Sequence, residues 1–142
     1  MENTKQKTVH LTITVPSGVF YEGDVPIVTL KTAVGYIALQ PGREPLFSSV
    51  EIGNVFIGWK SSPECITCVI GGGLVYADKE KINIITDDII NVKNIDLVRA
   101  QNDRDKLQAM LSDKKSDTDI SKLELKLKKT LSRIDSYNLY NK

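Results

Sequence analysis

The spacing of apolar residues changes once along this chain, near Asp88, and this change constrains the fold more than any other feature of the sequence. Before Asp88, apolar and polar residues alternate in short runs, as in strands that bury one face. After Asp88, apolar residues recur about every three and a half positions, as along a helix that buries one stripe. The sequence therefore predicts a β domain followed by helices.

Short strands with frequent turns are predicted for the first part of the chain. The segment 10–15 alternates most clearly, with Leu11, Ile13 and Val15 on one face. All five prolines and all nine glycines lie at or before Gly73 and separate the runs at spacings of about 8–12 residues. This pattern is typical of an antiparallel sandwich or barrel. Further strands are predicted within residues 25–30, 36–39, 51–59, 66–70, 73–77 and 81–86.

Two helices are predicted for the second part. Leu97, Ala100, Arg104, Leu107 and Leu111 follow one helical stripe, which predicts the first helix. The stripe of the second, at heptad spacing, consists of Ile120, Leu123, Leu127, Leu131 and Ile134. Asn94 or Asp96 can cap the first helix, and the polar residues 113–119 separate the two. A short polar link predicts an antiparallel two-helix hairpin.

Charge divides the chain at the same place. Residues 1–90 carry 7 Lys and Arg against 10 Asp and Glu, whereas residues 91–142 carry 12 against 8. We therefore expect two structural units, 1–90 and 91–142, with different partners. The narrow seams of the hairpin bury too little to offset the entropy of ordering it alone, so it must pack against the sandwich or another protein. A hairpin with two docking surfaces is a candidate conformational switch.

Few residues offer chemistry. His10 is the single histidine, so a metal cluster built on several histidines is excluded, and a Ser-His-Asp triad would have to use it. Cys65 and Cys68 form one Cys-x-x-Cys pair in a strand, without the second pair of a zinc site or the helix N-terminus of a redox motif. We therefore expect no catalytic residue, no metal ligand and no enzyme activity.

Phosphate loops and nucleic-acid binding are also disfavoured. No Gly-Lys-Ser/Thr follows the glycine run 71–73, which predicts a bulge or bend in a sandwich, and Asp87-Asp88 falls at the boundary between units. Lys and Asp interleave over residues 114–133 without aromatic residues, so we expect no nucleic-acid partner. No apolar run is long enough to cross a bilayer and no signal segment is recognisable, which predicts a cytosolic protein without membrane insertion.

Two segments, residues 15–25 and 32–46, carry a resemblance to a known family. They read VPSGVFYEGDV and TAVGYIALQPGREPL, and they resemble the N-terminal domain of the epsilon subunit of F-type ATP synthases. The matching segments 51–53, 71–75, 82–87 and 95–100 follow in the order that this family shows. The resemblance covers about residues 8–135 and is specific because the segments occur together.

The resemblance implies a β-sandwich of about ten strands with a C-terminal two-helix hairpin. It implies a non-catalytic central-stalk subunit of the rotor that couples the c-ring and the gamma subunit to the catalytic head, during proton-driven ATP synthesis. Loops of the sandwich would contact the c-ring and gamma. The matching residues here are Gly35, Tyr36, Arg43 and Glu44, of which Tyr36 and Arg43 replace the acidic residue and the histidine usual in the family.

The resemblance also implies that the hairpin is regulatory. In relatives it extends along gamma to the alpha and beta subunits and blocks hydrolysis, and Lys122, Lys126 and Lys128 are the candidates for that inhibitory contact, with Lys129 and Arg133 beside them. In some bacterial members the compact hairpin binds ATP as a regulatory ligand. The ATP-binding candidates are Asp96, Arg99, Lys129 and Arg133, while Ile90 and Lys106 depart from the pattern of those members.

A second interpretation remains open. The heptads of 120–134 could pair with a copy of themselves, which would make the chain a free-standing β-sandwich binding module with a helical dimerisation hairpin. Under the first interpretation the protein is a peripheral subunit on the cytoplasmic face of a bacterial cell membrane, and a plastid thylakoid is the less favoured place.

Overall fold

The chain divides into two units, residues 1–89 and 90–142, in the computed structural model, which describes residues 7–113 and 120–140. The first unit is built from strands and the second from helices. Most of the predicted linker 113–119 lies outside the described residues.

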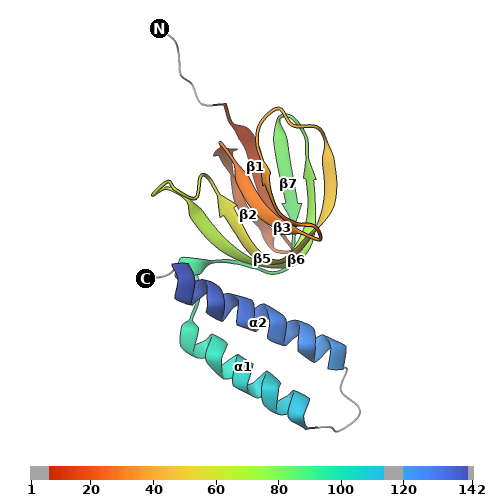
Figure 1. Cartoon of the computed structure of the whole chain (residues 1–142), viewed down its shortest axis with the longest axis vertical. Helices are drawn as coiled ribbons and strands as arrows, with labels where there is room; N and C mark the ends of the chain where they lie inside the picture. The colour runs from red at the N-terminus through yellow and green to blue at the C-terminus, as the bar shows by residue number, and fades with distance from the viewer. Residues whose placement is uncertain (1–6, 114–119, 141–142) are drawn as a thin grey trace. The chain divides into compact units, whose positions relative to one another are not determined.

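A sheet folded around one core forms the first unit, and the last of its eight strands runs on into the second unit (Figure 1). The strands are β1 (Val9–Val15), β2 (Gly18–Val25), β3 (Val28–Thr32), β4 (Gly35–Leu39), β5 (Leu46–Ile57), β6 (Ile66–Ala77), β7 (Lys81–Ile85) and β8 (Ile89–Asn91). They are ordered β2-β1-β7-β6-β5-β3-β4, and β8 pairs with β6. The predicted N-terminal β-sandwich is therefore confirmed.

The core is filled from the inner faces of these strands. Leu11 and Ile13 of β1 are fully buried, as their alternation predicts, and Ile82 and Ile84 of β7 lie beside them in register. The remaining large buried side chains come from β3, β4, β5 and β6, and they include Val28, Leu30, Leu39, Val55, Ile70 and Val75. Branched aliphatic side chains suit this pleated, fully buried position.

Two long strands join the layers of the sandwich. β5 and β6 pair antiparallel along twelve residues each. In β6 the core positions are Cys68 and Ile70 before the glycines but Val75 and Ala77 after them, so the buried face changes from even to odd positions. The same change separates Val50 from Val55 in β5. Each strand therefore turns its other face to the core as it passes from one layer to the next.

The glycine run lies at this crossing. Gly72 has φ +97°, a conformation that side chains with a Cβ rarely adopt. The buried hydroxyl of Thr86 donates a hydrogen bond to the carbonyl oxygen of Gly72 (2.5 Å), and the Gly71 N–H donates to the Asp88 carbonyl (2.7 Å). The backbone after β7 thus packs directly against the bend.

Three details differ from the sequence-based expectation. The sheet has eight strands rather than about ten, and the predicted strands 66–70 and 73–77 are one strand, β6, which bends at its glycines as predicted. The strand predicted within 51–59 begins earlier, at Leu46. β1 pairs in parallel with β7, whereas a wholly antiparallel sandwich was expected.

The second unit is a helical hairpin. A 3₁₀ helix, η1 (Val92–Asn94), precedes α1 (Leu97–Ser112) and α2 (Ile120–Tyr140), which run antiparallel side by side (Figure 1). Asp96 begins α1 as its N-cap, and Asp113 ends it as the C-cap. The predicted two-helix hairpin is therefore confirmed.

The apolar stripe of α2 is only partly buried. Leu123 and Ile134 are buried and Leu127 is half-buried, but Ile120 and Leu131 are exposed, at 60% and 37%. An α-helix repeats every 3.6 residues, so a heptad stripe drifts around the helix and cannot stay against one neighbour along a straight helix. The expectation that all five stripe residues lie in the seam is wrong for Ile120 and Leu131.

We predict that Gly73→Ala destabilises the sandwich by about 1–3 kcal/mol, because a Cβ there would collide with the backbone carbonyl of Ile85. Chemical denaturation followed by circular dichroism measures this loss. Gly23→Ala is the matched control, since its Cβ would meet only the movable Tyr21 side chain. Equal stability of the two variants would contradict the close approach at Gly73.

Candidate functional site

The beginning of α1 is held by two side-chain caps in succession. The Asn91 side chain accepts the N–H of Lys93 (2.9 Å) before η1, and the Asp96 carboxylate accepts the N–H of Arg99 (3.1 Å) before α1. Each cap satisfies a backbone N–H that has no partner within its helix. Asp96 therefore has a structural role as the N-cap of α1.

A cavity of about 150 Å³ lies within the helical unit beside this cap. It brings together three of the four residues predicted to bind ATP, namely Asp96, Arg99 and Arg133. Its other lining residues are Ile90, Asn94, Ile95, Ala100, Asp103 and Thr130. Carboxylate, guanidinium and amide groups thus face the same small space, which can accept and donate several hydrogen bonds.

A second cavity, of about 320 Å³, lies between α1 and α2 and contains the fourth predicted residue, Lys129. It is lined by Asp103, Lys106, Leu107, Met110, Lys126, Lys129, Thr130 and Arg133. The two cavities share Asp103, Thr130 and Arg133, so they are adjacent. Leu107 and Met110 give the second cavity an apolar wall beside four cationic side chains, which suits a ligand with a flat apolar part and phosphates.

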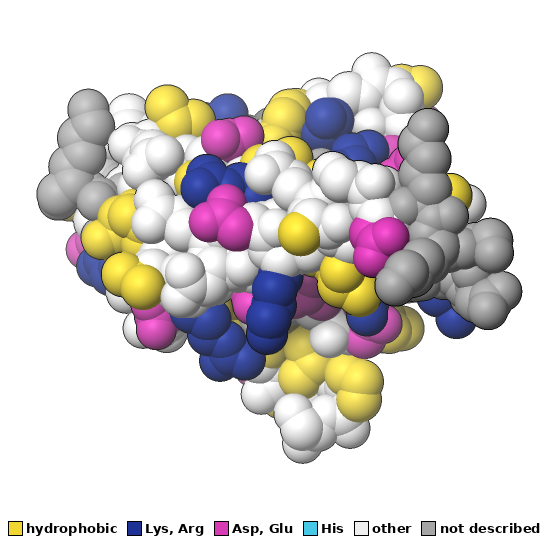
Figure 2. All heavy atoms as spheres, turned by 90° about the horizontal axis from the view of Figure 1, so that it is seen from below, with side chains coloured by type: hydrophobic (Ala, Val, Ile, Leu, Met, Phe, Trp, Pro, Cys, Tyr) yellow, Lys and Arg dark blue, Asp and Glu magenta, His cyan; other side chains and the backbone are white. Residues whose placement is uncertain are grey.

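The lysines predicted for the inhibitory contact separate into two groups. Lys126 lines the second cavity together with Lys129 and Arg133. Lys122 and Lys128 are exposed and line neither cavity. On the face of the molecule seen in Figure 2, cationic, acidic and apolar side chains are intermixed.

The sequence interpretation missed Asp103 and Thr130 as cavity residues. A signal was present, because Arg99, Asp103 and Lys106 recur at spacings of four and three along α1 and so share one helix face. Which face of α2 meets them depends on how the two helices pack, and that requires the structure.

The residues predicted to contact the c-ring and gamma lie at opposite ends of one strand. Gly35 and Tyr36 begin β4, after the hairpin tip where Val34 is 91% exposed. The Tyr36 hydroxyl accepts the Asn54 N–H (3.2 Å), and the Lys60 ammonium lies 5.7 Å from the centre of the Tyr36 ring. Tyr36 is thus held in place by contacts on two sides.

Arg43 and Glu44 lie in the loop after β4. The Arg43 side chain donates from Nε to the Glu44 carbonyl oxygen (3.2 Å). The Gly42 N–H donates to the Lys79 carbonyl oxygen (3.0 Å), which joins this loop to the turn between β6 and β7. Tyr36 and Glu44 are exposed and Gly35 and Arg43 are half-buried, so each predicted contact pair has one residue at the surface.

An apolar outer face on the sheet was not predicted. It consists of Phe47, Leu74, Tyr76 and Ile85, which are 71%, 46%, 42% and 59% exposed. Phe47 lies opposite Tyr76 across β5 and β6, and Leu74 lies opposite Ile85 across β6 and β7, so the four form one patch. Consecutive apolar residues such as Ile84-Ile85 were the available signal, since neighbours in a strand point to opposite faces.

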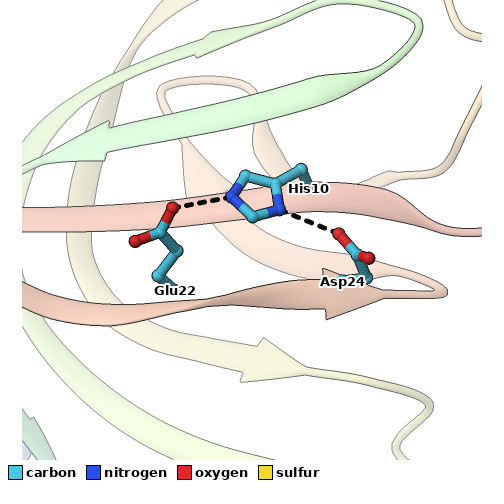
Figure 3. A network of polar contacts seen from close by, with 3 residues as sticks. All are labelled: His10, Glu22 and Asp24. Carbon is cyan, nitrogen blue, oxygen red and sulfur yellow. Dashed lines mark hydrogen bonds and ion pairs between the residues drawn. The ribbon is translucent and has the colours of Figure 1, made fainter.

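His10 lies between two carboxylates on the exposed side of β1 (Figure 3). Its Nδ1 lies 2.8 Å from Asp24 Oδ1 and its Nε2 lies 2.9 Å from Glu22 Oε2. The hydrogen bond to Asp24 and then that to Glu22 raise the pKa of His10 above its usual value. The arrangement places the predicted structural or solvent-facing histidine in a surface ion-pair network.

The cysteine pair is unsuited to thiolate chemistry. Cys68 is buried, and burial raises the pKa of its thiol to about 12. Burial also raises the pKa of Cys65. Both thiols stay protonated near neutral pH, so neither is an activated nucleophile.

Across residues 7–113 and 120–140, no group of three or more His, Cys, Asp or Glu is placed to hold a metal ion. In the same residues, neither helix is long and apolar enough to span a membrane.

We predict that the pKa of His10 falls when either partner is neutralised, as in Asp24→Asn or Glu22→Gln. Because the folded-state pKa is raised, the stabilisation is present below the unfolded value of about 6.5 and is lost as pH rises through the folded pKa. A proton NMR titration of the single imidazole measures the shift. An unchanged midpoint in both variants would show that the carboxylates do not interact with the ring.

Comparison with known proteins identifies relatives over most of the chain. Residues 8–92 match the family described as ATP synthase, Delta/Epsilon chain, beta-sandwich domain. The chain is 39% identical over 132 residues to a protein of Mycoplasmopsis synoviae named ATP synthase epsilon chain, covering 93% of this chain and 96% of that one. A protein of the same name from Bacillus subtilis is 30% identical over 129 residues, covering 91% and 96%.

Solved structures show the same fold. A chain in the Euglena gracilis mitochondrial ATP synthase, from a structure of OSCP, F1 and c-ring, superimposes with a TM-score of 0.74 at 15% identity, over 93% of this chain and 88% of that chain. A chain from the central stalk and c-ring of the Tetrahymena thermophila mitochondrial ATP synthase gives a TM-score of 0.54 at 16% identity, over 98% and 100%.

Proposed function

This chain belongs to the family of ATP synthase epsilon chains, and from that membership we propose that it couples the c-ring and the gamma subunit to the catalytic head. Epsilon chains are non-catalytic subunits of the central stalk, and ATP synthesis and ion transport are functions of the whole complex. The observation that carries the proposal is the match of residues 8–92 to the family together with an exposed docking face on the same domain.

The apolar outer face is the surface that we assign to gamma. Its four side chains form one patch across β5, β6 and β7, and a contiguous apolar patch on a folded domain marks an interaction site. The hairpin tip at Val34 and the loop of Arg43 and Glu44 are assigned to the c-ring. In this arrangement the sheet face and the loops bind different partners, so one rigid domain can transmit torque between them.

The place of the protein follows from these partners. A subunit that binds the c-ring through its loops is held at the membrane surface without entering the bilayer. Its relatives are bacterial epsilon chains, and we place this chain on the cytoplasmic face of the cell membrane.

We predict that Ile85→Glu reduces the amount of this subunit that co-purifies with gamma by at least about tenfold, because an unpaired carboxylate in an apolar interface is costly. The measurement is the subunit ratio after affinity purification of the assembled complex. Val19→Glu is the control, since Val19 of β2 is exposed, lies outside the patch and is assigned to neither partner. It should retain gamma. Equal recovery of gamma by wild type and Ile85→Glu would exclude the assigned face.

The helical unit is the regulatory part in this proposal. Its two adjacent cavities would hold ATP, with the phosphates near the cations Lys129 and Arg133 and the nucleoside near Asp96 and Arg99. Support comes from the convergence of all four predicted residues on the two cavities. ATP acts here as a signal and not as a substrate.

In an inhibitory state, α2 would contact the catalytic head and not a bound nucleotide. When α2 extends to the alpha and beta subunits, Lys122, Lys126 and Lys128 would contact acidic segments. Individual exposed ion pairs contribute at most about 1 kcal/mol, so several must act together. Because Lys126 lines the second cavity, occupation of that cavity by ATP and binding of Lys126 to the catalytic head exclude each other.

We predict saturable binding of ATP to the isolated full-length protein by isothermal titration, weakened about tenfold or more by Arg133→Ala, because Arg133 lines both cavities. Lys128→Ala is the control and should bind as the wild type does.

A substitution that tests whether the Asp96 carboxylate binds ATP must keep the N-cap of α1. Asp96→Ala would remove the N-cap as well as the carboxylate, whereas Asp96→Ser keeps a capping oxygen. A loss of ATP binding in Asp96→Ser with unchanged helicity assigns the carboxylate to the ligand. Absence of heat from the wild type up to millimolar ATP would reject the nucleotide site.

A further inference from the structure

Asp103 occupies an unusual position in the helical unit. It lines both cavities, together with Thr130 and Arg133. Among the described residues, none forms a hydrogen bond or an ion pair with its carboxylate. An acidic side chain therefore faces the space where the proposed function places a polyanion.

Cationic side chains surround Asp103, so its negative charge changes how the cavities interact with a triphosphate. Arg99 and Lys106 lie about one turn to either side of Asp103 on the same face of α1, and Arg133 faces it from α2. Without Asp103, the shared part of the cavities would present Arg133 and the neutral Thr130 to a triphosphate, with no negative charge. With it, a free triphosphate meets a carboxylate that repels it.

The other carboxylate of the two cavities is already engaged. Asp96 accepts the backbone N–H of Arg99 as the cap of α1. Asp103 is thus the lining carboxylate that can take a new partner without loss of a helix cap. Magnesium bound to a nucleotide is commonly held by one or two carboxylates and the substrate phosphates, with water completing its octahedron.

We infer that Asp103 makes this site select the magnesium complex of a nucleoside triphosphate over the free triphosphate. The inference rests on the proposed nucleotide site. Magnesium lowers the negative charge of the ligand, and it offers Asp103 a cation to bind directly or through a water molecule. Asp103 is in this sense the residue that sets which charge form of the nucleotide enters the cavities.

Removing the negative charge of Asp103 should reverse the effect of magnesium on ATP binding. In a cavity whose charged lining residues are only Lys and Arg beside a capped Asp96, magnesium competes with those cations for the phosphate oxygens, so it should weaken binding. In the wild type it should strengthen binding. Asp103→Asn keeps the size of the side chain and removes the charge, so the effect of magnesium should reverse.

The experiment is isothermal titration of the full-length protein with ATP, in excess magnesium chloride and, separately, in EDTA. Wild type, Asp103→Asn and Asp105→Asn are compared. Asp105 is the matched control, because it is an exposed aspartate of α1 that pairs with Arg104 and lines neither cavity. Thermal unfolding of wild type and Asp103→Asn without ligand should coincide, since Asp103 is exposed and has no partner to lose.

We expect magnesium to tighten ATP binding about fivefold in the wild type and in Asp105→Asn, and to weaken it in Asp103→Asn. Equal magnesium effects in wild type and Asp103→Asn would overturn the inference while leaving the nucleotide site intact. Binding by the wild type that is tighter in EDTA than in magnesium would also overturn it. Absence of binding by all three proteins in both buffers would reject the nucleotide site and the inference together.

Discussion

The paired strands β5 and β6 hold the sandwich together, because they are the elements that belong to both of its layers. Each must present one set of side chains to the core at its beginning and the opposite set at its end. A strand can do this only if its backbone turns over between the two halves. Gly72 of β6 allows that turn through its positive φ, and the Ile85 carbonyl and the Thr86 side chain leave no room for a side chain at Gly73. The remaining strands add to edges that this bent pair creates.

The sequence predicted those parts of the fold that depend on local spacing. Leu11 and Ile13 alternate, and both are buried, while the helical spacing after residue 94 gives two helices. The length of β6 could not be predicted in this way. The glycine run predicted a bend, but whether one strand continues through that bend depends on packing against residues far along the chain, which becomes visible only after folding. The parallel pairing of β1 with β7 could not be predicted for the same reason, since the sequence of neither strand indicates which strand it pairs with.

In the candidate sites, too, some residues could be identified from the sequence and others only from the way the elements pack. The family resemblance selected Asp96, Arg99, Lys129 and Arg133, and these do line the two adjacent cavities. Asp103 and Thr130 escaped attention because their position matters only once α1 and α2 lie side by side. The outer face at Phe47 and Ile85 was missed for a different reason. Apolar residues in strands were assigned to the core, although two consecutive ones cannot both point inward.

The neighbours of β1 also set the order in which the chain can fold during synthesis. β1 is the first strand to leave the ribosome, yet one of its edges pairs with β7, which begins at Lys81. That edge stays open until more than half of the chain has been made. The sandwich therefore has a high contact order and completes its sheet only when the segment just before the helices emerges. Until then β1 exposes an unpaired edge and its apolar side chains, so the nascent chain depends on speed or on chaperones to avoid aggregation.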